Sequence, residues 1–186
     1  ANLIFHRGVE LEPKIAGVLM SAIVSDTLLF RSPTATPLDK ETALKLATIA
    51  GIEDVEDYAM KLLRHGDVIS TMPPADLVRN DIKEFDFGEQ KVGVAQINIM
   101  DREYAKTKYP ELQSALQALK KEDGYDFALL LVTDILGQAS DLLVAGEPQS
   151  ILISAFGEKT EDGFYYLPGC LSRKKQVIPP LTEVFR

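Results

Sequence analysis

Apolar side chains near the start of the chain recur every three or four residues, which is the spacing of one face of an α-helix. This segment begins at Leu11-Glu12-Pro13 and ends at Ser25-Asp26-Thr27. Its apolar stripe consists of Ile15, Val18, Leu19, Ala22 and Ile23. The pattern predicts a helix that packs this stripe against a core.

Two more helices are marked by residues that favour helix ends. The first begins after Thr36, an N-cap residue followed by Pro37, and stops at Gly51. The second begins after Asp54 and stops at Gly66. The expected inward residues are Ala43, Leu46, Ala47 and Ala50 in the first helix, and Val55, Tyr58, Ala59 and Leu62 in the second.

The rest of the chain has the patterns of strands. Residues 82–87 alternate between apolar and polar, and a turn leads into a second strand over 91–100. Residues 127–132 are continuously apolar, which is typical of a central strand covered on both faces. Further strands are expected over 142–145 and 164–167.

Helices are predicted between and after these strands. They cover 75–79, 110–123 with Pro110 in the first turn, 148–156, and a short last helix that has proline in its first turn after Val177. Strands interleaved with helices, including at least one hairpin, predict an α/β fold: a mixed β-sheet flanked by helices.

Composition narrows the functional classes. The chain has 186 residues, a formal net charge of -8 and a sequence pI near 4.8. Binding to nucleic acid or to an anionic membrane needs a broad positive face, so neither partner is expected. No apolar run reaches the roughly 18 residues of a membrane span. The single Cys170 has no partner for an internal disulfide, which favours a reducing cytoplasm and a buried, unreactive thiol.

Against this acidic background, Ser172-Arg173-Lys174-Lys175-Gln176 concentrates three cations. The planar guanidinium of Arg173 matches two oxygens of a phosphate, and the lysines add point charges beside it. The helix expected after Val177 would bring free backbone N–H groups near the same anion. The alternative is a solvated surface turn, which is common for so short a basic run.

The same pentapeptide resembles the substrate-binding motif of family II, manganese-dependent inorganic pyrophosphatases. A second stretch, Ser25 to Thr36, is similar to the segment that closes the N-terminal domain of that family, with Arg31 where most members carry lysine. Residues 81–85 and 94–98 also resemble the family's C-terminal domain. The two motifs occur in the family's order, and the resemblance spans nearly the full chain.

The resemblance implies roles for particular residues. Arg173 and Lys174 would bind the phosphoryl groups and stabilise transition-state charge, and Lys175 would support the positive field. Asp26 corresponds to a metal-ligating aspartate, for manganese or alternatively magnesium or cobalt. Arg64, before Gly66, corresponds to a substrate-contacting lysine, and arginine keeps that charge with a different reach.

The family's N-terminal histidine and aspartate motifs, including Asp-His-His, are absent from this sequence, and its histidines, His6 and His65, are expected to be non-ligands. The resemblance therefore implies a C-terminal remnant of the metal-binding domain plus linker over 1–35 and a substrate-binding domain over 36–186. It implies that the longer enzyme hydrolyses pyrophosphate and forms a homodimer through its N-terminal domain. The isolated chain is expected to be inactive.

Two alternatives to pyrophosphatase activity remain at this point. One is an exopolyphosphatase or related phosphoesterase with the same two-domain plan. The other is a non-catalytic, anion-binding regulatory module that keeps the cationic motif.

Overall fold

The computed structural model describes residues 2–146 and 149–185. Contacts between residues divide the chain into two compact units, Ala1–Gly66 and Asp67–Arg186. The boundary expected from the family, between residues 35 and 36, remains a prediction about domains.

Unit 1 is helical and contains α1 (Asn2–His6), α2 (Pro13–Asp26), α3 (Pro37–Ala50) and α4 (Val55–His65). Both α3 and α4 pack against α2. The fully buried residues of this core are Ala16, Met20, Val24, Ala43, Leu46, Ala47 and Ala59. The three longer helices were expected from the sequence at these positions.

The stripe predicted for α2 was partly wrong. Ile15 and Val18 are 50% and 67% exposed, whereas the inward positions are Ala16, Met20 and Val24. These three residues also have helical spacing, so the pattern alone offered two stripes. The observed choice follows from packing against α3, because Ala16, Met20 and Val24 share one core with residues of that helix.

The start of α3 confirms its predicted cap. The hydroxyl of Thr36 accepts a hydrogen bond from the Asp39 N–H at 3.3 Å, and the Asp39 carboxylate accepts one from the Thr36 N–H at 2.8 Å. At the other end, Gly51 adopts a left-handed conformation with φ 71°. Both ends of α3 are therefore fixed by residues visible in the sequence.

We expect Thr36→Ala to lower the free energy of unfolding of unit 1 by about 1 kcal/mol, because the Asp39 N–H loses its acceptor. Urea unfolding followed by circular dichroism measures the change. Thr36→Ser keeps the hydroxyl and is the matched control. Equal losses in the two variants would contradict this account of the cap.

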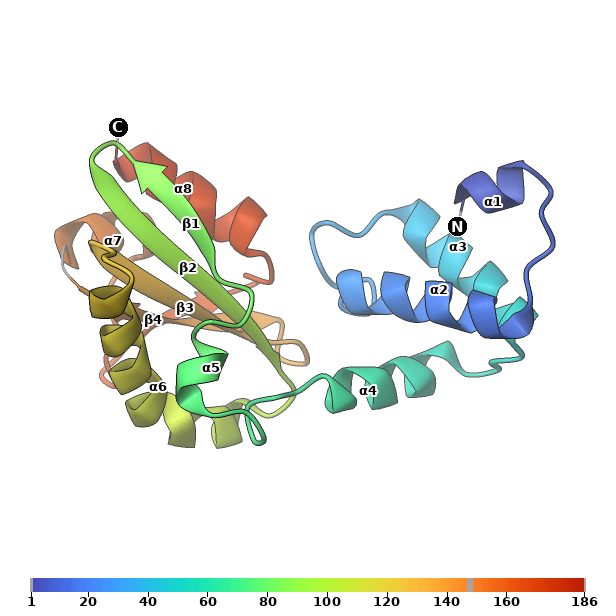
Figure 1. Cartoon of the computed structure of the whole chain (residues 1–186), viewed down its shortest axis with the longest axis horizontal. Helices are drawn as coiled ribbons and strands as arrows, with labels where there is room; N and C mark the ends of the chain where they lie inside the picture. Colours follow the sequence, from blue (N-terminus) through green and yellow to red (C-terminus); the bar gives the residue numbers. More distant parts are fainter. Residues whose placement is uncertain (1, 147–148, 186) are drawn as a thin grey trace. The chain divides into compact units, whose positions relative to one another are not determined.

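Unit 2 is built on one five-stranded sheet in sequence order (Figure 1). The strands are β1 (Lys83–Phe87), β2 (Gln90–Ile99), β3 (Phe127–Asp134), β4 (Ala139–Ala145) and β5 (Tyr165–Pro168). The β2–β3 pair is parallel, and the other three pairs are antiparallel.

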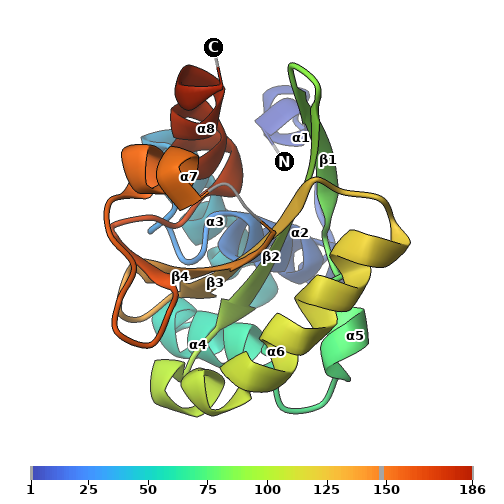
Figure 2. The same cartoon turned by 90° about the vertical axis from the view of Figure 1, so that its left-hand side faces the viewer.

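Helices cover both faces of this sheet. On one face lie α5 (Pro74–Leu77) and α6 (Arg102–Glu122), and on the other lie α7 (Gln149–Phe156) and α8 (Ile178–Val184) (Figure 2). Helix α6 forms the crossover that parallel strands β2 and β3 require. The predicted fold class, a mixed sheet flanked by helices, is confirmed.

The predicted start of α6 at Pro110 was wrong. The helix begins eight residues earlier, after Asp101, whose carboxylate caps the Tyr104 N–H at 2.9 Å. Pro110 lies inside the helix, where it removes the N–H that would bond to the Lys106 carbonyl. Apolar residues on both sides of Pro110, from Ala105 to Leu119, are buried in the core and keep the helix on the sheet.

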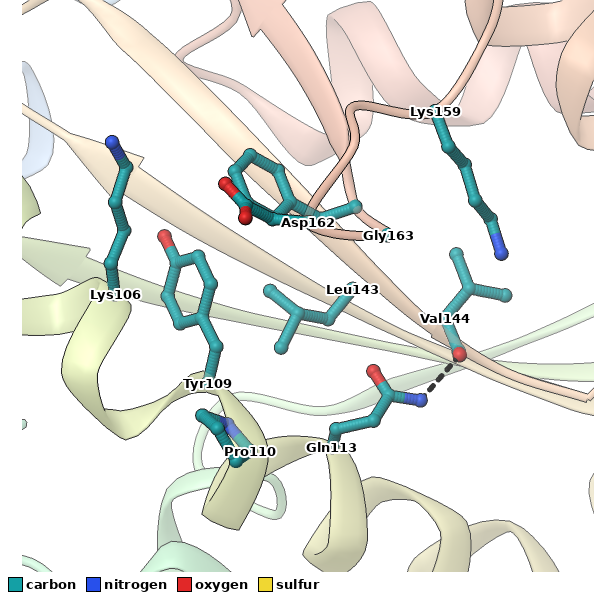
Figure 3. Close-up of a pocket in the computed structure, with 10 residues that line it drawn as sticks. Lys106, Tyr109, Pro110, Gln113, Leu143, Val144, Lys159, Asp162 and Gly163 are labelled. Atoms are coloured by element: carbon teal, nitrogen blue, oxygen red, sulfur yellow. Dashed lines mark hydrogen bonds between the residues drawn. The ribbon is translucent and has the colours of Figure 1, made fainter.

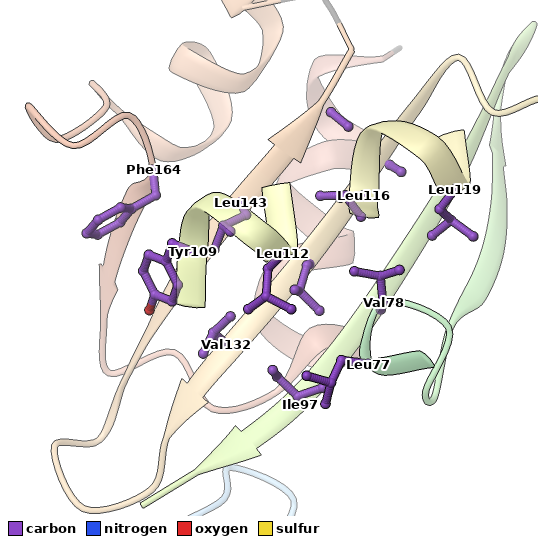
Figure 4. Packing of buried hydrophobic residues seen from close by; sticks show 14 of the residues in the cluster. Leu77, Val78, Ile97, Tyr109, Leu112, Leu116, Leu119, Val132, Leu143 and Phe164 are labelled. Atoms are coloured by element: carbon purple, nitrogen blue, oxygen red, sulfur yellow. The ribbon is translucent and has the colours of Figure 1, made fainter. Parts of the chain in front are cut away.

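Strand β3 divides the core of unit 2 into two layers. Its alternate residues Ala128, Leu130 and Val132 join the layer under α5 and α6, which Figure 4 shows in part. Phe127, Leu129 and Leu131 join the layer under α7 and α8. All six are at most 1% exposed, which confirms the central strand predicted from its continuous apolar run.

The sequence also made predictions about Cys170 and about membrane-spanning helices. Cys170 is 6% exposed, and burial raises the pKa of its thiol, as expected for an unreactive side chain. Within the described residues, no helix has both the length and the apolar character needed to cross a membrane.

Candidate functional site

The three cations of the Ser172–Gln176 motif lie on a single turn of π-helix, Arg173–Val177, that leads directly into α8. Ser172 is its N-cap, and its hydroxyl accepts the Lys175 N–H at 3.4 Å. Proline occupies the first turn of α8, as the sequence predicted. We call Ser172–Lys175 the cationic turn.

Arg173 is the buried member of the cationic turn and is only 5% exposed. Its Nη1 donates to the Val94 carbonyl at 2.8 Å and to the Asp81 carbonyl. Its Nη2 lies 3.2 Å from a carboxylate oxygen of Asp81, whose side chain is 54% exposed. The guanidinium thus ties the cationic turn to β2 and to Asp81, two residues before β1.

Lys174 and Lys175 are exposed, in contrast to Arg173. Within the described part of the chain, Lys174 forms no hydrogen bond or ion pair. Its ammonium group is therefore available to an anion from solution. It can offer three N–H donors without first breaking an interaction within the protein.

Two glutamines that the sequence analysis gave no role hold the cationic turn in place. Gln176 accepts the N–H groups of Leu171 and Ser172 on its Oε1, at 2.9 and 3.1 Å. Its Nε2 donates to the Gly169 carbonyl at 2.8 Å. This side chain closes the loop that leads from β5 into the cationic turn.

Gln96 performs the matching task from β2. Its Oε1 accepts the Arg173 N–H at 3.3 Å, and its Nε2 donates to the Thr133 hydroxyl at 3.0 Å. Ser140 extends this network: its hydroxyl donates to the Cys170 carbonyl at 2.6 Å and lies 3.0 Å from the Thr133 hydroxyl. The available sequence signal for Gln96 was a neutral polar residue between the apolar Ala95 and Ile97.

We expect Gln96→Ala to speed amide hydrogen exchange of Arg173 roughly fivefold, because losing one intramolecular hydrogen bond costs about 1 kcal/mol. Exchange measured by NMR gives this rate. Gln113→Ala, on α6, is the control that removes a different glutamine from unit 2. An unchanged Arg173 rate in Gln96→Ala would show that the side chain does not hold the turn.

Asp26, the expected metal ligand, is the last residue of α2 and is exposed. The chain then makes a left-handed turn, in which Leu28, Leu29 and Phe30 have φ of 49°, 53° and 62°. Such conformations cost non-glycine residues about 1–2 kcal/mol each. The Thr27 hydroxyl supports the turn by donating to the Ile23 carbonyl and accepting the Phe30 N–H.

A carboxylate oxygen is a suitable ligand for manganese or another hard divalent cation, so Asp26 fits one position of such a site. Among the residues that the structure describes, no three histidine, cysteine, aspartate or glutamate side chains are grouped to hold a metal ion. The chain accordingly offers one candidate ligand and no complete site within its described residues.

Arg64 lies in the last turn of α4 and is exposed. It belongs to unit 1, as does Asp26, whereas the cationic turn belongs to unit 2. The structure therefore brings Arg173, Lys174 and Lys175 together on one turn and leaves Asp26 and Arg64 on separate helices of the other unit.

Comparison with known proteins connects this geometry to a family. A model of the DHHA2 domain matches residues 60–184. A manganese-dependent inorganic pyrophosphatase of Methanocaldococcus jannaschii is 41% identical over 99% of this chain and 60% of its own length. A probable enzyme of the same name from Archaeoglobus fulgidus is 39% identical over 99% of the chain and 58% of its own length.

A solved structure agrees with these sequence relatives. A crystal structure assigned to a family II inorganic pyrophosphatase of Methanococcus jannaschii matches with a TM-score of 0.84 and 42% identity. The match covers 95% of this chain and 57% of that one. The chain thus spans a little under two thirds of the length of these relatives, and the resemblance noted in the sequence is confirmed. This chain belongs to the DHHA2 domain family.

Proposed function

We propose that this chain is the substrate-binding part of a metal-dependent inorganic pyrophosphatase, which hydrolyses pyrophosphate to two orthophosphates. The observation that carries the proposal is the cationic turn, which exposes Lys174 in a protein of net charge -8. The names of the relatives, which match almost the whole chain, support pyrophosphate as the anion.

Lys174 is the proposed direct contact to a phosphoryl oxygen. Its charge neutralises the anion on binding and stabilises the charge that develops as the phosphoanhydride bond breaks. Lys175 adds to the positive field beside it. Arg64 is proposed as a further substrate contact from α4.

Arg173 is proposed to bind phosphate by exchanging partners. Its Nη2 already faces a carboxylate, that of Asp81, at a partly exposed position. A phosphate offers the same paired oxygens with more charge, so it can replace Asp81 while the Val94 carbonyl keeps Nη1 in place. Asp81 would then set how readily the guanidinium is released.

Asp26 is proposed as one oxygen ligand of a manganese ion, with magnesium or cobalt as alternatives, and residues outside this chain would supply the other ligands. When bound, such ions lower the pKa of a coordinated water and so provide a nucleophile. We further propose the domain division at residues 35 and 36, a homodimer formed through the metal-binding region, and a cytoplasmic location.

Phosphate release from pyrophosphate tests the proposal. The chain alone with manganese is expected to release none, whereas its fusion to the metal-binding region of the Methanocaldococcus jannaschii relative is expected to be active. Long-chain polyphosphate as the preferred substrate would instead indicate an exopolyphosphatase. A folded fusion that binds imidodiphosphate but turns over neither substrate would indicate a non-catalytic module.

A further inference from the structure

Unit 2 contains a cavity of about 540 Å³ that is separate from the cationic turn (Figure 3). It lies between α6, strand β4 and the segment that precedes β5. Cavities of several hundred Å³ are the usual size for small-molecule sites. None of its lining residues belongs to the proposed pyrophosphate site.

The walls of this cavity are apolar and held in place. Phe164 and Tyr109 are 5% and 8% exposed, and their rings pack edge to face with centroids 5.3 Å apart. The Tyr109 hydroxyl donates to the buried Asp141 carboxylate at 2.7 Å, so its ring is anchored. Leu143 lies beside Tyr109 on the wall of the cavity (Figure 3). A flat apolar group would contact these walls without requiring them to move.

The cavity opens where β5 stops pairing with β4. The last pair along β4 is Leu142 with Tyr165, so Val144 has no β5 neighbour. Its carbonyl instead accepts a hydrogen bond from the Gln113 side chain at 2.7 Å (Figure 3). A ligand that covers this strand edge therefore leaves the Val144 carbonyl paired.

Two lysines stand at opposite ends of the cavity in Figure 3. Lys106 on α6 is 2.9 Å from Glu103, and Lys159 lies with its Nζ 5.6 Å from the centre of the Tyr165 ring. Among the described lining residues the opposing acid is Asp162. The cavity therefore has a cation at each end, Lys106 beside Glu103 and Lys159 beside the Tyr165 ring.

We propose that this cavity binds a small organic anion with a flat apolar body and an acidic group at each end, of the aromatic dicarboxylate class. The body lies against Leu143, Tyr109 and Phe164 on the outer side of this ring pair. One acidic group meets Lys106 and the other meets Lys159. Inorganic phosphate and pyrophosphate lack an apolar body and gain nothing from these walls.

The test uses naphthalene-2,6-dicarboxylate as the probe and ¹⁵N NMR of the full chain as the readout. We expect saturable shifts at the amides of Leu143, Val144 and Gly163. Lys106→Gln and Lys159→Gln are each expected to weaken binding about fivefold, the upper range for a partly exposed ion pair. Succinate, which has two carboxylates and no ring, is expected to produce no shifts at these amides.

Lys108→Gln is the matched control, because Lys108 also lies on α6 and also faces an acid three residues away, Glu111, yet does not line this cavity. It is expected to bind the probe like the original chain. The proposal is overturned by the absence of shifts at the cavity amides at millimolar probe. It is equally overturned if all three lysine variants bind alike. Neither result bears on pyrophosphate hydrolysis.

Discussion

Lys174→Gln is expected to lower the turnover of pyrophosphate by about 100-fold in the active fusion with the metal-binding region. Removing one positioned group that stabilises transition-state charge typically costs a factor of 10²–10³. Lys174 is exposed and has no partner within the described residues, so its loss removes a substrate contact and leaves the fold intact. Steady-state phosphate release gives kcat and KM separately.

Lys121→Gln, at an exposed position on α6 outside the cationic turn, is the control and is expected to retain full turnover. Circular dichroism and urea unfolding of Lys174→Gln should match the unsubstituted protein. If the variant keeps its turnover while remaining folded, the cationic turn does not contact the reacting phosphates, and the proposed function loses its main support.

Asp141→Ala is expected to lower the free energy of unfolding of unit 2 by about 3–5 kcal/mol, the usual cost of removing one partner of a buried ion pair. Asp141 is 1% exposed and accepts two hydrogen bonds from Arg102, at 2.8 and 2.9 Å, and one from Tyr109. Burial and the hydrogen bond to Asp141 raise the pKa of Tyr109. Without the carboxylate, the Arg102 guanidinium and the Tyr109 hydroxyl are still withdrawn from water but lose the acceptor that compensates for this.

Urea unfolding monitored by fluorescence or circular dichroism measures this loss. Asp86→Ala is the control, because Asp86 is an exposed aspartate on β1, and its replacement is expected to change the free energy by less than about 0.5 kcal/mol. Asp141→Asn keeps an acceptor of the same shape and should fall between the two. Similar losses in Asp141→Ala and Asp86→Ala would mean that the buried network contributes nothing.

The elements of this fold were largely predictable because their signals are local. The caps at Thr36 and Asp54 and the continuous apolar run over 127–132 each report on neighbouring residues, and the structure agrees with all three. The start of α6 was missed because the preference of proline for a first turn was outweighed by tertiary contacts on both sides of Pro110.

Only part of the candidate site could be predicted from the sequence. A run of three cations identified the cationic turn, but not that Arg173 would be buried against Asp81, ninety-two positions earlier. The roles of Gln96 and Gln176 depend on which backbone groups the turn leaves unpaired, and such groups appear only once the strands have their registers. The sequence showed which side chains are cationic or polar, but it did not show which residues they contact in the fold.

The parallel pairing of β2 with β3 also has a consequence for how the chain folds. Each of their pairs, from Val92 with Phe127 to Ile99 with Asp134, has the whole of α6 between its members. During synthesis the β1–β2 hairpin leaves the ribosome before β3, with the edge of β2 open to other strands. Such non-local pairing slows folding, so this edge of β2 stays unpaired until both α6 and β3 have been synthesised.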